Sequence, residues 1–313
     1  MKFDGRWLVV FLVVISSVIS TGTCVSISIT GGNSATINGA DSTQGVSTPD
    51  GTTIMATGSI RAALDNAIPG ATISLLPKTY YEIVQVPISL NIIGAGSGST
   101  IVDGQQLGSV FIIPSGVTVG LADMTIQNGM TQSGGGIYNA GTLTVKGCKI
   151  TGNTAYNDGG GVCNYGTATV TGSTISGNTA ERNGGGFFNS GTGAELSLSN
   201  SLITGNTAYS DGGGIYNTNG GSYNPNSNSS LVVGETTQIT NNQATTGYGG
   251  GIYSDAGSVT FDGKNVGVKY NKAHLPATGS SWYQGWGVYL TSEVPITKNG
   301  FYSATQVTGN VNV

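Results

Sequence analysis

Residues 134–154 and 159–179 read GGGIYNAGTLTVKGCKITGNT and GGGVCNYGTATVTGSTISGNT, two copies of one pattern placed 25 residues apart. Further glycine triplets begin at Gly184, Gly212 and Gly249, after gaps of 25, 28 and 37 residues. Each triplet leads into an apolar residue that is usually followed by an aromatic one, and an Ile-x-x-Asn block precedes the next triplet. Internal repeats of this length indicate a solenoid, in which each repeat packs against its neighbours.

The segments between these blocks alternate apolar and polar residues, as in Thr142–Val145 and Thr167–Val170. We therefore predict three short strands per repeat, forming one triangular coil, with coils stacked about 4.8 Å apart. Roughly nine or ten coils would give a rod about 45 Å long at that spacing. The general rule for parallel crossovers predicts a right-handed sense. The predicted fold is an all-β, right-handed parallel β-helix of one chain over residues 25–313, with its clearest repeats between 116 and 290.

Stacked coils place equivalent residues above one another. We predict that Ile137, Leu143, Val145 and Ile150 point inward in their coil. The asparagines of the Ile-x-x-Asn blocks are predicted to form a turn ladder, because an amide can bond its copy one coil away. These are Asn153, Asn178, Asn206 and Asn242. An outward aromatic stack is predicted for Tyr138, Phe188, Tyr216 and Tyr253.

One segment ahead of the repeats has a helical pattern. Residues 59–67 read SIRAALDNA, in which Ser59 can cap the N-terminus, the apolar residues share one face, and Pro69 and Gly70 follow the end. Terminal coils of solenoids need covers for their open interior. We therefore predict a capping helix at about residues 59–67.

The first 22 residues have the pattern of a signal peptide. Lys2 and Arg6 precede an apolar run of 13 residues at 7–19, which is too short to span a bilayer comfortably. Cleavage is expected after about Ser20, and a lipid on Cys24 is the alternative. No later stretch is apolar enough for a transmembrane helix, so we expect a secreted, extracellular or cell-surface protein.

Composition excludes one class of partner and predicts little disulfide chemistry. The net charge is −4, and beyond the signal peptide Arg61 and Arg182 are the only arginines, so there is no basic stripe for nucleic acid. Of the three cysteines, Cys148 occupies an inward position and Cys163 an outward one. We expect no bridge between them.

The paired blocks resemble those of the polymorphic outer-membrane proteins of bacterial surfaces, whose repeats carry Gly-Gly-Ala-Ile and Phe-x-x-Asn. Here Gly134–Ile137 and Ile150–Asn153 are similar, with Gly for Ala and Ile for Phe. Residues 58–104, with LNIIGAGSGSTIVDG, resemble the opening coils of pectin-lyase-like β-helices. The resemblance implies a β-helical surface protein of adhesive or cell-envelope structural role. It also implies polysaccharides or other surface proteins as partners.

Two other functions remain open. A polysaccharide lyase or hydrolase needs clustered carboxylates, yet the repeat region has few acids. Asp158 and Asp211 share the position before a triplet, with Asn183 between them, and His274 is the only histidine. We pair Arg182 with Glu181 on the surface and assign no catalytic, cofactor-binding or metal-binding residue. An ice-binding protein is the further alternative, resting on the threonines Thr142, Thr144, Thr167 and Thr169.

Two insertions interrupt the repeat, at residues 219–230 and 274–283. Insertions in solenoids project from one face, often the binding face. Aromatic side chains stack well on sugar rings and concentrate binding energy. We therefore predict four ligand contacts, Tyr223 in the first insertion and Trp282, Tyr283 and Trp286 in or beside the second. The alternative is that Trp286 and Tyr289 continue the aromatic stack.

Overall fold

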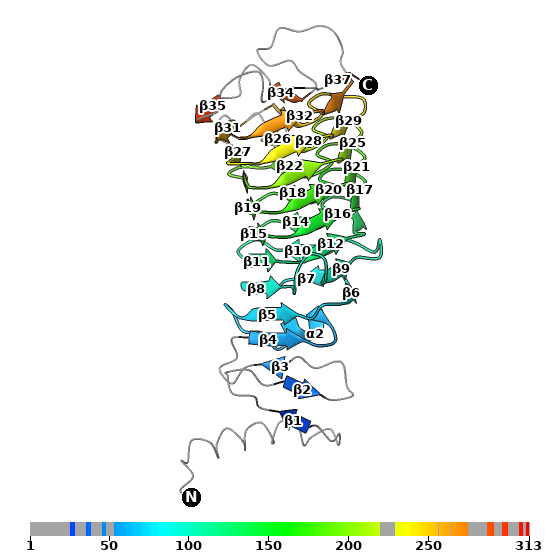
Figure 1. The fold of residues 1–313 in the computed structure, drawn as a ribbon, viewed down its shortest axis with the longest axis vertical. Coiled ribbons are helices and arrows are strands. Elements are labelled where there is room, and N and C mark those ends of the chain that lie inside the picture. The colour runs from blue at the N-terminus through cyan, green and yellow to red at the C-terminus, as the bar shows by residue number, and fades with distance from the viewer. Residues whose placement is uncertain are drawn as a thin grey trace, which may run out of the picture.

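The computed structural model describes residues 53–219, 229–255, 257–263, 265–274 and 287–290. It also gives the backbone of six short strands, β1 (Ser26–Ser28), β2 (Thr36–Asn38), β3 (Val46–Ser47), β35 (Ile296–Asn299), β36 (Val307–Thr308) and β37 (Val311–Asn312). The molecule is an all-β parallel solenoid of about seven turns, whose strands stack along its long axis (Figure 1). The predicted nine or ten coils agree with the nine-stranded sheet but exceed the about seven turns in which all four sheets take part. The predicted signal peptide at 1–22 and Cys24 lie outside the described residues.

The strands form four long sheets that follow one another around each coil. The eight-stranded sheet contains β7 (Val84–Gln85), β10 (Phe111–Ile113), β14 (Ile137–Asn139), β18 (Val162–Asn164), β22 (Phe187–Ser190), β26 (Ile215–Thr218), β30 (Ile252–Ser254) and β34 (Val288–Leu290). The eleven-stranded sheet contains β3, β4 (Thr53–Ala56), β5 (Thr72–Leu75), β8 (Leu90–Ile93), β11 (Thr118–Ala122), β15 (Thr142–Lys146), β19 (Thr167–Thr171), β23 (Glu195–Ser199), β27 (Ser230–Gly234), β31 (Ser258–Asp262) and β35.

The nine-stranded sheet contains β6 (Thr79–Tyr81), β9 (Ile101–Asp103), β12 (Thr125–Gln127), β16 (Lys149–Thr151), β20 (Thr174–Ser176), β24 (Leu202–Thr204), β28 (Gln238–Thr240), β32 (Gly267–Lys269) and β36. The seven-stranded sheet contains β13 (Met130–Thr131), β17 (Thr154–Ala155), β21 (Thr179–Ala180), β25 (Thr207–Ala208), β29 (Gln243–Ala244), β33 (Lys272–Ala273) and β37. Pairing is parallel within these four sheets, except that β3 runs antiparallel to β4. Strands β1 and β2 form a separate antiparallel pair.

A regular coil therefore has four strands rather than the predicted three. The additional strand has two residues, such as Thr154 and Ala155, directly after the asparagine of the Ile-x-x-Asn block. It pairs in register with Thr179 and Ala180 one coil on. Two residues are too few to show alternation, so the sequence pattern did not reveal this strand.

The core is a narrow column of apolar side chains inside the coil. At one strand position Ile137, Val162, Phe187, Ile215 and Ile252 lie in register, and each is at most 1 % exposed. Leu143 and Val145 of β15 and Ile150 of β16 are buried in the same way. The predicted inward residues therefore do form the core.

The predicted capping helix is shorter than expected. Helix α2 covers only Ile60–Leu64, because the amides of Asn66 and Ala67 bond carbonyls three residues back and tighten the chain into a turn. Ser59 caps the helix by accepting from the Ala62 amide. Figure 1 places α2 at the level of β4 and β5, near the N-terminal end of the stack, and its residues Ile60, Ala63 and Leu64 are buried in the core. No helix in the described part of the chain is long and apolar enough to cross a bilayer.

Candidate functional site

The four predicted ladder asparagines lie in one fully buried column. The Nδ2 of Asn153 donates to the Oδ1 of Asn178 at 3.0 Å, and the same bond joins Asn178 to Asn206 and Asn206 to Asn242, each at 2.9 Å. Asn271 adds a further rung at 2.9 Å. Each Nδ2 also donates to an isoleucine carbonyl of the previous coil, as Asn178 does to Ile150 at 3.0 Å. Because these amides are satisfied inside the coil, they stabilise the stack and offer nothing to a ligand.

A second column of amides was missed by the sequence analysis. It follows the aromatic position of each coil and joins Asn139 to Asn164 at 2.6 Å, and then Asn164 to Asn189 and Asn189 to Asn217, each at 2.7 Å. The repeated Asn after Ile-Tyr, Val-Cys and Phe-Phe was the available signal. These side chains are fully buried, so this ladder is also structural.

The acids before the glycine triplets bind the backbone. Asp158 Oδ1 accepts from the Asn183 amide at 3.1 Å, and Asp211 Oδ1 accepts from the Tyr248 amide at 2.6 Å. Burial raises the pKa of both carboxyls above the usual range. Arg182 pairs with Asp158 at 3.7 Å, and not with Glu181 as the sequence analysis expected. The two aspartates therefore act as turn acceptors in coils that are two apart.

Within the described ranges, no group of three or more His, Cys, Asp or Glu side chains is placed to hold a metal ion. His274 is exposed directly after β33 of the seven-stranded sheet, and its amide donates to the Ala244 carbonyl at 3.3 Å.

An aromatic column runs along the outer side of the eight-stranded sheet. It consists of Tyr138, Tyr165, Phe188, Tyr216, Tyr253 and Tyr289. Neighbouring ring centroids are 4.8 to 6.2 Å apart, and the last three pairs are stacked within 9° of parallel. In these three stacked pairs the ring faces are used against one another. The Tyr216 hydroxyl is further engaged, since it bonds Asp255 Oδ2 at 3.2 Å.

Cys163 is buried, although its strand position was predicted to face outward. Its strand position points outward, in register with Tyr138 and Phe188, but the residue is 0 % exposed. Tyr165, two residues later, joins the column in this coil and helps to cover the thiol. Cys148 is buried as predicted, and both cysteines are free. The four predicted ligand contacts, Tyr223, Trp282, Tyr283 and Trp286, lie outside the described residues, so they remain predictions.

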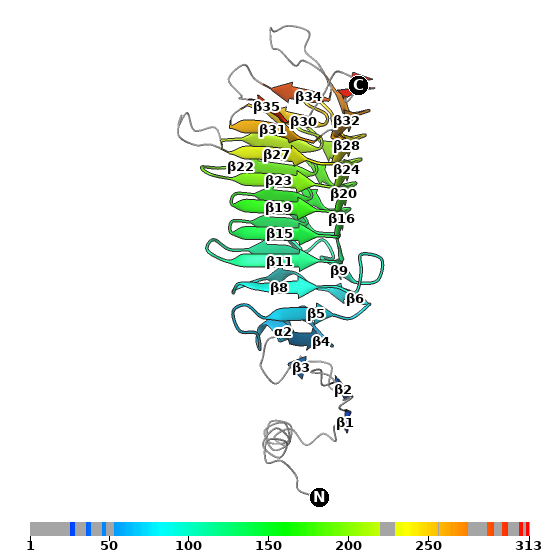
Figure 2. The ribbon, with the colours of Figure 1, turned by 60° about the vertical axis from the view of Figure 1, so that its left-hand side comes forward.

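Polar side chains also line the outer face of the eleven-stranded sheet, which Figure 2 shows with its strands one above another. Outward residues stand in register there, and one column runs through Gly120, Thr144, Thr169, Ser197, Val232 and Thr260. The neighbouring column passes from Thr142 and Thr167 to Glu195. Glu195 and Val232 interrupt the threonine array on which the ice-binding alternative rests.

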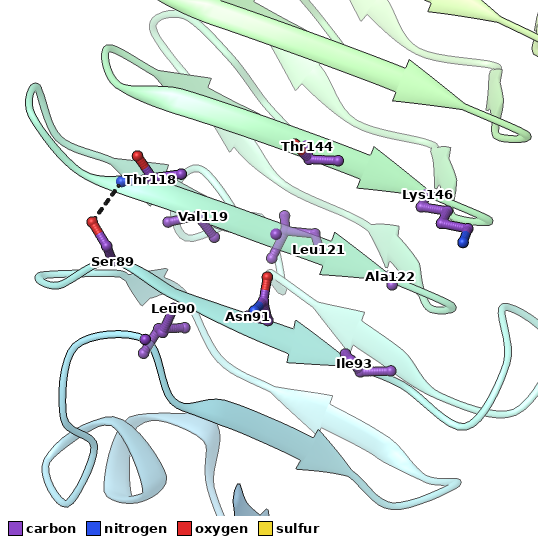
Figure 3. A pocket seen from close by; sticks show the side chains of 12 residues that line it. Ser89, Leu90, Asn91, Ile93, Thr118, Val119, Leu121, Ala122, Thr144 and Lys146 are labelled. Atoms are coloured by element: carbon purple, nitrogen blue, oxygen red, sulfur yellow. Dashed lines mark hydrogen bonds between the residues drawn. The ribbon is translucent and has the colours of Figure 1, made fainter. Parts of the chain in front are cut away.

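A hollow of about 390 Å³ opens on this face near its N-terminal end (Figure 3). Gly120 and Ala122 of β11 form its floor. Asn91 and Ile93 stand beside them on β8, and Thr144 and Lys146 stand on β15. Ser89 Oγ accepts from the Thr118 amide at 2.9 Å at one end. The hollow exists because β11 presents a glycine and an alanine where both neighbouring strands present larger side chains. The sequence alone did not predict this hollow.

Together, the ladders, the outward columns and the coil order define a parallel β-solenoid built from glycine-triplet repeats. Residues 200–218 and 236–255 match the family model described as the Chlamydia polymorphic membrane protein repeat, so this chain is a β-helix protein that carries such repeats. Each matched segment includes one asparagine of the first ladder, Asn206 or Asn242, and one glycine triplet. Proteins of that repeat family are autotransporter-type surface proteins and are generally non-enzymatic. No curated protein matches the chain.

Proposed function

We propose that this chain is a non-enzymatic, secreted or cell-surface β-helix protein with an adhesive or cell-envelope structural role. The observation that carries the proposal is the outward face of the eleven-stranded sheet, where polar side chains from successive coils stand in register. The buried asparagine amides beneath are hydrogen-bonded within the stack. Such a surface suits a long, repetitive partner, because polar groups recur on several successive coils, about 4.8 Å apart. The partner we propose is a cell-surface polysaccharide or another surface protein.

Three finer points belong to the same proposal. We take the coils to wind right-handed, as parallel crossovers generally do. We take residues 1–22 to direct export. We also keep Trp282, Tyr283, Trp286 and Tyr223 as proposed ligand contacts, because their residue types concentrate binding energy. Trp282→Ala tests the last point. If a folded variant retains cell-envelope fragments as well as the parent does, Trp282 is not a ligand contact.

Blocking one face at a time tests the main proposal. In a Cys24→Ser background, Thr169→Cys introduces a thiol on the eleven-stranded sheet, and Thr179→Cys introduces one on the seven-stranded sheet; both positions are exposed. A bulky maleimide polymer should label only the new thiol, because Cys148 and Cys163 are buried. We expect the immobilised parent to retain envelope fragments, and labelling at position 169 to abolish that retention.

Labelling at position 179 is the matched control and should leave retention unchanged. Equal loss from both labels would remove the eleven-stranded face from the proposal. No retention by the unlabelled parent would contradict an adhesive role. Release of cleaved sugar from a panel of polysaccharides would contradict the non-enzymatic part and favour the lyase or hydrolase.

A further inference from the structure

The hollow on the eleven-stranded sheet differs from the rest of that face in shape. Along this outward column the hollow is centred on Gly120, whereas the following coils carry Thr144, Thr169 and Ser197. A Cβ placed on Gly120 would meet the Oδ1 of Asn91, so the Asn91 side chain leans over the glycine. Figure 3 shows Asn91 reaching from β8 toward β11. The missing side chain thus leaves room for the Asn91 amide, which lies over Gly120 at the floor of the hollow.

The hollow also differs from the rest of the eleven-stranded face in charge. Lys146 is the one charged residue among those that line the hollow, and it stands at the C-terminal end of β15. The Asp123 carboxylate lies over Gly147, in the turn beyond the strands, and does not line the hollow. In a chain of net charge −4, this hollow therefore presents a local positive charge.

The remaining groups suit a hydroxylated ring. Asn91 can donate and accept hydrogen bonds, and the hydroxyl of Thr144 can do the same from the opposite wall. Ile93, which is 37 % exposed, and Ala122 supply an apolar patch beside them. The volume falls within the range of small-ligand sites, roughly 300–1,000 Å³.

We propose that this hollow binds a carboxylate-bearing sugar unit of a polysaccharide. The apolar face of the sugar ring lies on Ile93 and Ala122, its hydroxyls bond Asn91 and Thr144, and its carboxylate faces the Lys146 ammonium. This inference rests on the proposed adhesive function and names the chemical class of its ligand. A ligand held mainly by one exposed ion pair binds more weakly as salt rises.

Nuclear magnetic resonance titration with soluble oligosaccharides tests the site. The probes are an oligoglucuronate, a neutral glucose oligomer of the same length, and acetate. We expect the oligoglucuronate to shift the amide signals of Gly120, Ala122 and Thr144, with affinity falling as salt rises. The neutral oligomer and acetate should bind at least about tenfold more weakly, a difference of about 1.4 kcal/mol. Equal binding of the neutral oligomer would overturn the acidic class, and equal binding of acetate would reduce the site to a simple anion site.

Two variants and two matched controls locate the binding. Lys146→Gln removes the charge, with Lys149→Gln as control, because Lys149 is exposed on β16 and outside the hollow. Gly120→Thr fills the floor with the residue found one coil on, and Ser197→Thr adds bulk to the same column elsewhere. We expect tenfold or greater loss for Lys146→Gln, no detectable binding for Gly120→Thr, and parental affinity for both controls.

Unchanged affinity in either hollow variant would overturn the site. The adhesion assay stays a separate readout, because it measures retention of whole envelope fragments. A parent that retains fragments but ignores every soluble probe would therefore contradict the hollow while leaving the adhesive role standing.

Discussion

Tyr165 occupies the place in the aromatic column that Cys163 leaves open. Cys163 holds the strand position between Tyr138 and Phe188, and the Tyr165 ring, from the turn that follows, lies 5.7 Å from Tyr138 and 6.2 Å from Phe188. The outward thiol thereby becomes part of the interior. Burial raises the pKa of Cys163 to about 12 and that of Cys148 to about 11.

The first prediction concerns thiol reactivity. Alkylation requires the thiolate, which a raised pKa suppresses, and burial also blocks access. We expect Cys148 and Cys163 of the folded protein to resist iodoacetamide at pH 8, and to react at once in denaturant. Mass spectrometry of tryptic peptides measures both. Rapid labelling of Cys163 in the folded state would show that Tyr165 does not close over it.

The second prediction is a loss of stability at high pH. In the unfolded chain cysteine ionises near pH 8.5, whereas the folded thiols keep their protons to about pH 11 and 12. The unfolded state then binds fewer protons, so the free energy of unfolding falls as pH rises above about 8.5. Denaturant titrations at pH 7, 8.5 and 9.5 measure this. A Cys148→Ala, Cys163→Ala double variant should show a shallower fall up to pH 9.5, and an unchanged slope would contradict the assignment.

The third prediction concerns the asparagine ladder. Asn178→Ala leaves the Asn153 amide without its Asn178 acceptor in a buried site. We expect the free energy of unfolding to drop by about 1–3 kcal/mol. The control is Asn157→Ala, because Asn157 bonds Gln132 near the surface and should lose little. Equal denaturation midpoints for the two variants would argue against the ladder as a stabilising element.

The fourth prediction concerns close coil contact at the glycine triplets. A Cβ on Gly185 would lie 2.5 Å from the carbonyl oxygens of Gly213 and Thr207. Backbone cannot shift there without breaking the stack, so Gly185→Ala should destabilise the protein by about 2–3 kcal/mol. Gly98→Ala is the control, since a Cβ there meets nothing within 4 Å. Thermal melting compares the two, and a parental melting temperature for Gly185→Ala would contradict this packing.

The fifth prediction is export with cleavage. Lys2, Arg6 and the apolar run at 7–19 predict removal of about the first 20–23 residues. Mass spectrometry of the exported protein measures the new N-terminus. An N-terminal Met1 on protein recovered outside the cell would show that the segment is retained.

Repetition made part of this molecule predictable. The positions of Asn153, Asn178, Asn206 and Asn242 followed from their equivalent places in successive copies, as did the inward residues such as Ile137 and Ile150. What was missed depends on contacts that no single repeat encodes. The strand of Thr154 and Ala155 is too short to show a period. The burial of Cys163 depends on the ring of Tyr165, which lies two residues later in the same coil.

The hollow was missed for a related reason. Gly120 and Ala122 are unremarkable along the chain, because small residues are common in it. They matter only beside Asn91 and Ile93 on one strand and Thr144 and Lys146 on the other, and that comparison requires the register of β8, β11 and β15. A site of this kind arises between coils, so it becomes visible only after the coils are aligned.

The ladder rungs also bear on how such a protein can change over generations. Asn153 and Asn178 are 25 residues apart, whereas Asn206 and Asn242 are 36 apart, and the bonds that join them are 3.0 and 2.9 Å long. The extra residues therefore leave the contact between coils as it was. Unequal recombination between two copies would add or delete one whole coil and regenerate the same junction. Such a lineage can lengthen its rod, shorten it or exchange its loops without having to invent a new fold.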